Sequence, residues 1–145
     1  KMAEFTSHSN WCNVAIWENE TRPKRSTWSS KGCCAYVHDF ADYVYGITDF
    51  YTDERSKRYI DVSEVKSGDV IHYIFKDSKG NDIEHWMAVL SRNEDGTLKT
   101  AEGNFYDKST GKYIVKISEE AYVISQGKLK HYNQNVTVTD AYHFN

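Results

Sequence analysis

The chain has 145 residues, of which 18 are basic and 21 acidic, and 39% of its residues are hydrophobic. This length suits one domain with a sizeable core, and the composition excludes a collagen-like or disordered chain. The net charge of −3 argues against a nucleic-acid binder, because such proteins normally carry a basic excess. No run of about 18 apolar residues occurs, so the sequence predicts no membrane span.

Three cysteines are too few for a disulfide-dense scaffold, and their odd number leaves at least one thiol unpaired within the chain. Cys33 and Cys34 are neighbours, and a disulfide between adjacent residues would be strained. Cys12 stands apart, and we interpret it as a small packing residue or an accessible thiol. The first residues lack a signal-peptide pattern, which does not in itself indicate a cytoplasmic location.

The N-terminal part is expected to form an extension, residues 1–26, and residues 21–31 are polar and basic, as in a loop. Apolar residues then recur at three- and four-residue steps from Cys33 to Val44, which is typical of one helix face. Ser29 and Ser30 stand where they could cap this helix, and Gly46 is placed to end it.

After a polar stretch, residues 47–67, the pattern changes to short apolar segments separated by turn residues. Strands are predicted at 70–75, 85–90, 98–101 (continuing over 104–106), 112–117 and 135–144, with a short helix opening at 118–120. Residues 77–82 and 93–96 carry turn signals. One helix followed by an antiparallel meander predicts an α+β domain.

Four polar residues in this layout suggest nucleophilic chemistry. Cys33 lies in the first turn of the predicted helix, where the partial positive charge of the helix terminus stabilises a thiolate. His85 opens a strand and could accept the thiol proton. Glu102 and Asn104 follow on the next strand, where a polar group could fix the orientation of the imidazole.

The order Gly-Cys-Cys-Ala-Tyr-Val, Ser-Gly-Asp-Val-Ile, His-Trp-Met-Ala-Val-Leu and Ala-Glu-Gly-Asn resembles the papain-like cysteine hydrolases of the NlpC and CHAP type. The resemblance covers about residues 27–117 and implies a papain-like catalytic core over residues 27–145. In that core a Cys-bearing helix packs on an antiparallel sheet. The whole chain, 1–145, is then a single catalytic domain that needs no cofactor or metal.

The resemblance also implies roles for individual residues. Cys33 would attack an amide carbonyl, His85 would act as base and then acid, and Glu102 would orient His85. Asn104 would assist or take the orienting role. The Cys33 N–H would supply one oxyanion donor, while the second stays unassigned because Gly32 stands where CHAP members often carry Gln.

The implied function is a monomeric amidase or endopeptidase acting on peptidoglycan peptides, outside the cell or in the cell envelope. Trp28 and Trp86 would flank its cleft and bind substrate. Cys34 and His72 are rivals for the catalytic roles, and a zinc site finds no support because no C-x-x-C is present. Two other functions stay open: a cysteine protease, deamidase or transglutaminase acting on protein, and a silent module that binds glycan or a partner.

Overall fold

The protein is described here by a computed structural model, which describes residues 1–7, 33–132 and 134–145. Its helices are α1 (Met2–Thr6), α3 (Cys33–Tyr45) and the 3-10 helix η1 (Val62–Glu64). The strands are β1 (Ser56–Tyr59), β2 (Val70–Lys76), β3 (Asp82–Arg92), β4 (Thr97–Asp107), β5 (Lys112–Ser125), β6 (Lys128–His131), β7 (Gln134–Asn135) and β8 (Thr137–Phe144). They form one antiparallel sheet in the order β1-β8-β2-β3-β4-β5-β6-β7.

The expected papain-like α+β fold is wrong. Half of the described residues lie in strands and 18% in helices, and α3 is the one long helix among them. The strands extend further than their apolar segments indicated, because ladder pairing also fixes polar residues as strand. Ser118, where a short helix was expected to open, instead pairs with Thr100 in the middle of β5, and β5 continues to Ser125.

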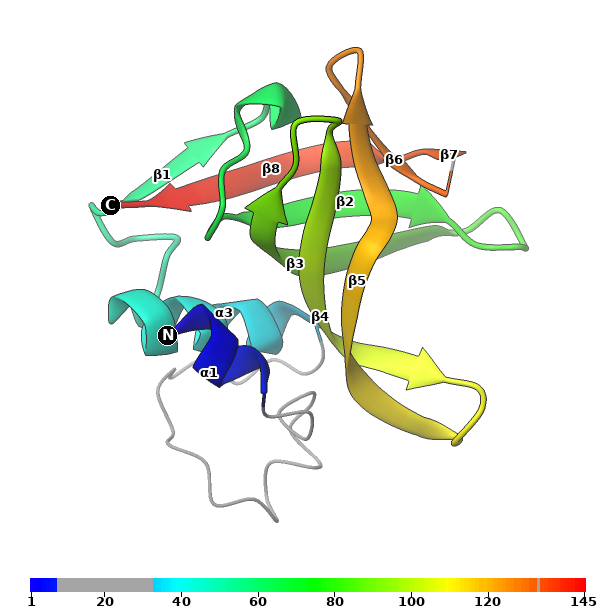
Figure 1. Ribbon diagram of the computed structural model, residues 1–145, viewed down its shortest axis with the longest axis horizontal. Helices are drawn as coiled ribbons and strands as arrows, with labels where there is room; N and C mark the ends of the chain where they lie inside the picture. Colours follow the sequence, from blue (N-terminus) through cyan, green and yellow to red (C-terminus); the bar gives the residue numbers. More distant parts are fainter. Residues whose placement is uncertain (8–32, 133) are drawn as a thin grey trace.

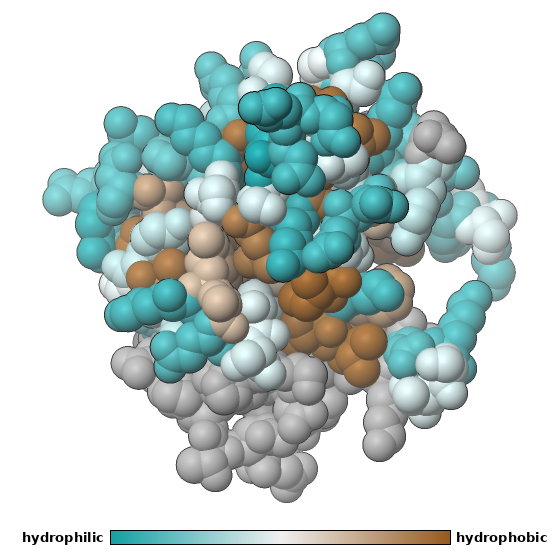
Figure 2. Space-filling model, in the orientation of Figure 1, coloured by the Kyte–Doolittle hydropathy of each residue, from teal (hydrophilic) through white to brown (hydrophobic). Residues whose placement is uncertain are grey.

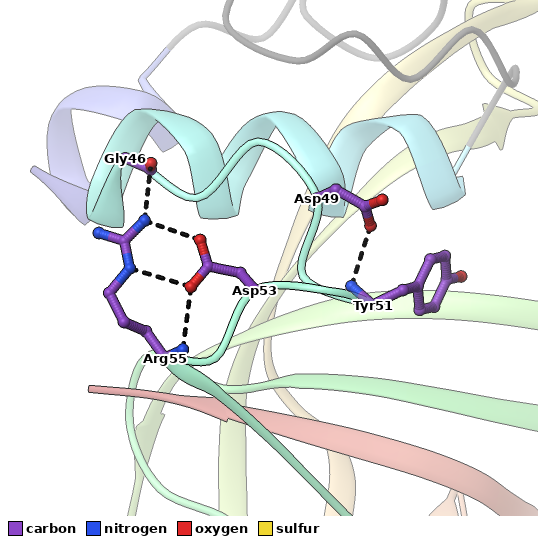
Figure 3. Close-up of polar contacts among 5 residues, drawn as sticks. All are labelled: Gly46, Asp49, Tyr51, Asp53 and Arg55. Atoms are coloured by element: carbon purple, nitrogen blue, oxygen red, sulfur yellow. Dashed lines mark hydrogen bonds and ion pairs between the residues drawn. The ribbon is translucent and has the colours of Figure 1, made fainter.

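The helix predicted from Cys33 onward is confirmed, and its end is well defined. Gly46, with a φ of 72°, follows α3 in the left-handed conformation that favours glycine. Arg55 donates to the Gly46 carbonyl and pairs with Asp53 at 2.8 Å, while Asp49 accepts from the Tyr51 N–H (Figure 3). These contacts fix the loop at the end of the helix that lies away from Cys33.

Two apolar clusters lie on opposite faces of the sheet. In β3, Trp86 and Ala88 belong to the cluster that includes α3, whereas Met87 and Val89 belong to the other cluster. This division follows from the alternation of side chains along a strand. Figure 1 shows α3 beneath the sheet, with the β4–β5 hairpin reaching out beyond the N-terminal end of the helix.

Gly103 in β4 allows the helix to approach the sheet closely. A Cβ placed at this position would lie 2.4 Å from Cβ and 2.6 Å from Cγ of Tyr36, and Tyr36 is fully buried. Because real Cβ contacts are longer, a larger residue at 103 would force α3 and β4 apart. The glycine therefore sets the distance between the Cys33 helix and the strand that carries Glu102.

Among the helices of the described residues, none combines the length and the apolar character that crossing a membrane requires.

Candidate active site

One pocket contains the three residues to which the sequence assigned nucleophile, base and orienting group. Cys33 is the first residue of α3, His85 lies on β3 and Glu102 lies on the neighbouring β4. The pocket has a volume of about 310 Å³ and is lined by Cys33, Tyr73, Phe75, Ile83, Glu84, His85, Glu102, Phe105, Tyr122 and His131. The sheet and the helix terminus thus place these groups around one space.

His85 and Glu102 form a short ion pair. The distance between His85 Nε2 and Glu102 Oε1 is 2.6 Å, and the Glu102 residue is only 3% exposed. A carboxylate at this position fixes the tautomer and the orientation of the ring. Because Nε2 faces Glu102, Nδ1 is the ring nitrogen that is left for the thiol.

The Cys33 thiol lies within hydrogen-bonding reach of the His85 side chain. Burial favours the neutral thiol, but the hydrogen bond and charge of His85 outweigh it and lower the Cys33 pKa. Backbone N–H groups of Trp86 and Cys34 also donate to the sulfur. Burial likewise opposes the charged imidazole, yet hydrogen bonds with Cys33 and Glu102 raise the His85 pKa to about 9. Both shifts favour the thiolate–imidazolium form of the pair over the neutral form.

Sequence reasoning did not find Tyr122 and Tyr73, which support the carboxylate. Tyr122 donates its hydroxyl to the same Glu102 oxygen at 2.6 Å, and the Tyr73 hydroxyl hydrogen-bonds to that of Tyr122. Burial and the Glu102 charge raise the Tyr122 pKa, so its hydroxyl stays a donor. No sequence signal marks Tyr122, because in the β4–β5 ladder it pairs with Leu98, whereas the ladder partner of Glu102 is Lys116.

The rivals for the catalytic roles have other partners. His72 pairs with Asp140 at 2.9 Å and with Glu84 at 3.2 Å, and its ring stacks on Trp86. The Cys34 thiol forms a hydrogen bond with the Tyr51 hydroxyl. Neither His72 nor Cys34 lines the pocket that holds His85 and Glu102.

The remaining predicted site residues are the substrate-binding candidates Trp28 and Trp86, and Asn104. Trp86 is 6% exposed, packs in the core and does not line this pocket, although its backbone N–H donates to the Cys33 sulfur. Trp28 and Cys12 lie outside the described residues. Asn104 belongs to β4, but its side chain is also outside the described part.

An apolar wall borders the reacting groups. Phe75, Ile83 and Phe105 line the pocket, and Ile83 and Phe105 are 38% and 37% exposed. Because exposed apolar surface beside a pocket favours contact with apolar ligand groups, this wall is suited to a substrate side chain.

Within the described part of the chain, no group of three or more His, Cys, Asp or Glu side chains is arranged to hold a metal ion. The comparison with protein-family models found no match. Searches among curated proteins and among solved structures found no match either.

Proposed function

We propose that this protein is a cysteine hydrolase that cleaves peptide or amide bonds through an acyl-enzyme. The observation that carries the proposal is the Cys33–His85–Glu102 arrangement, in which a thiol at a helix N-terminus contacts an imidazole held by a buried carboxylate. A nucleophile, a base and an orienting group in this order are the requirements for acyl transfer.

The geometry supports a two-stage reaction. The Cys33 thiolate attacks the carbonyl carbon, and His85 Nδ1 donates its proton to the nitrogen of the leaving amine as the C–N bond breaks. The resulting thioester is then attacked by water, whose proton returns to His85 while the C–S bond breaks. The carboxylic acid product leaves, and the thiolate–imidazolium pair is restored.

The proposed substrate is a peptide of peptidoglycan or another peptide or amide with an apolar group. The order of motifs in the sequence suggests peptidoglycan peptides and an extracellular or cell-envelope location. The apolar wall of Phe75, Ile83 and Phe105 suits a substrate with an apolar group next to the cleaved bond. A panel of purified cell walls, muropeptides and unfolded proteins, scored by the release of new amino groups, separates the substrate classes.

Matched variants test the chemistry independently of the substrate. Cys33→Ala is expected to abolish the release of amino groups and the rapid reaction with iodoacetamide below pH 8.5, since both need the activated thiolate. Cys34→Ala is the control and is expected to keep both, because the Cys34 thiol hydrogen-bonds to Tyr51, whereas the His85 side chain hydrogen-bonds to Cys33 and Glu102. If Cys33→Ala keeps full activity, or if the Cys33 thiol of the wild type reacts no faster than a free cysteine below pH 8.5, the proposal is wrong.

A further inference from the structure

A second pocket, formed by other residues than the Cys33 pocket, concentrates positive charge. It has a volume of about 660 Å³ and is lined by Lys57, Arg58, Tyr59, Ser63, Glu64, Val65, Lys66, Arg92 and His143. None of these residues lines the Cys33 pocket. We call it the basic pocket.

The charge of the basic pocket is unusual for this chain. Four of the nine lining residues are Lys or Arg, whereas about one residue in eight is basic in a chain of net charge −3. Glu64 is the one acidic residue that lines it. Figure 2 shows a mainly hydrophilic surface over the region where β1 and η1 lie in Figure 1.

Part of this charge has no acidic partner. Arg58 is paired with Asp140 at 3.0 Å, which compensates its charge. Lys57, Lys66 and Arg92 form no ion pair with a carboxylate of the described residues. Like charges that share a pocket repel one another, so an anion that enters it relieves this repulsion.

The Arg92 side chain in the wall of the basic pocket is held by two backbone carbonyl groups. Arg92 donates through Nη1 to the carbonyl oxygens of Ser63 at 2.6 Å and Val65 at 3.1 Å, so its guanidinium is oriented. Its Nη2 and Nε form no hydrogen bond with the described residues, so they can serve a ligand. An oriented guanidinium loses little entropy when it binds an oxyanion.

Asp69 anchors three other residues that line the basic pocket. This carboxylate is 1% exposed and accepts from the Tyr59 hydroxyl, from His143 Nδ1 at 2.8 Å and from the Lys66 N–H at 3.0 Å. Three lining residues are thus fixed by one buried group. The pocket therefore combines residues held in fixed positions with the exposed side chains of Lys57 and Lys66.

We propose that the basic pocket binds a phosphate group. An oriented guanidinium combined with lysine ammonium groups is the chemistry that proteins use for phosphate oxyanions, and the volume admits a phosphate with the groups attached to it. The source of the phosphate is either a small phosphate compound or the phosphodiester of a polyanionic polymer. This binding does not depend on the cysteine chemistry.

The test is a titration of the full chain with inorganic phosphate, followed by amide NMR shifts at Lys57, Lys66 and Arg92. In the double variant Lys57→Gln/Lys66→Gln we expect the affinity to fall by about tenfold or more, because two charge-assisted contacts are lost. The control Lys79→Gln/Lys128→Gln removes the same charge from exposed positions outside the pocket. It is expected to leave the affinity for phosphate unchanged. Glu64→Gln is expected to bind phosphate more tightly.

A second arm distinguishes the sources of the phosphate. Poly(glycerol phosphate) that binds more tightly per phosphate than the inorganic ion indicates a polymer, and equal affinity indicates a small compound. Absence of shifts at these amides, or equal losses in the two double variants, overturns the proposal. Polyglutamate that binds as tightly as the phosphate polymer overturns it too, because the site is then a general anion patch. The titration can be repeated with Cys33→Ala, whose binding is expected to match that of the wild type.

Discussion

The charge of Glu102 can be removed while its hydrogen bonds are kept, which makes Glu102→Gln the most informative variant of the Cys33 pocket. The oxygen that now accepts from His85 and from Tyr122, each at 2.6 Å, becomes an amide oxygen that still accepts from both. The variant therefore tests electrostatics apart from geometry. Glu102→Ala is the comparison, because it removes both.

The expected size of the effect follows from the hydrogen bond to His85. Hydrogen bonds to charged groups contribute about 1.5–3 kcal/mol and neutral ones about 0.5–1.5 kcal/mol, so losing the charge costs about 1–1.5 kcal/mol. One pH unit corresponds to about 1.4 kcal/mol. Since Glu102 stabilises the imidazolium, its loss lowers the His85 pKa, from about 9 in the wild type to about 8 by this conversion.

The assay is an NMR titration of the His85 ring in wild type, Glu102→Gln and Glu102→Ala. We expect the midpoint to fall from wild type to Gln and to fall further in Ala. The alkaline limb of the kcat/KM profile should move in the same direction, because the imidazolium is the acid that protonates the leaving nitrogen. A midpoint near 9 in Glu102→Gln would refute the assignment of Glu102 as the electrostatic partner of His85.

Three further changes test the surroundings of the site. Gly103→Ala is expected to lower the free energy of unfolding by about 1–3 kcal/mol and to reduce activity, because the new Cβ overlaps Tyr36; an unchanged Tm would contradict this close approach. Tyr122→Phe is expected to lower kcat by about tenfold with little change in KM, since one charge-assisted hydrogen bond is lost; wild-type kcat would show that the hydroxyl positions nothing. Phe105→Asp is expected to raise KM for peptides with apolar side chains by about tenfold, whereas Ile117→Asp, equally exposed but outside the pocket, is the control; similar KM values in the two variants would argue against an apolar wall.

Local patterns in the sequence predicted part of this arrangement. The 3.6-residue spacing after Cys33 identified the helix and placed Cys33 in its first turn, and the apolar run after His85 identified a strand. The adjacency of His85 and Glu102 followed from two consecutive strands joined by a short turn, and their contact is present. These inferences succeeded because they depend on residues close in sequence.

Long-range features were not predictable in the same way. The extent of the sheet was underestimated because Ser118 has no apolar pattern, and only pairing with β4 holds it in a strand. Tyr122 was missed because it pairs with Leu98 in that ladder, and only its hydroxyl reaches Glu102. Where a ladder is irregular, its register cannot be read from one sequence. The hydrogen bond from Tyr122 to Glu102 is therefore seen only in the structure.

The reacting pair joins two separately packed regions of the molecule. Cys33 packs against the apolar cluster under the sheet, which includes α3, whereas Tyr73 and Tyr122, which hold Glu102, belong to the cluster on the opposite face. A slight loosening of either region would separate sulfur from imidazole while most strand pairing persists. Thiolate reactivity is thus a sensitive reporter of how the helix is seated on the sheet, and it should decline on heating before the strands separate.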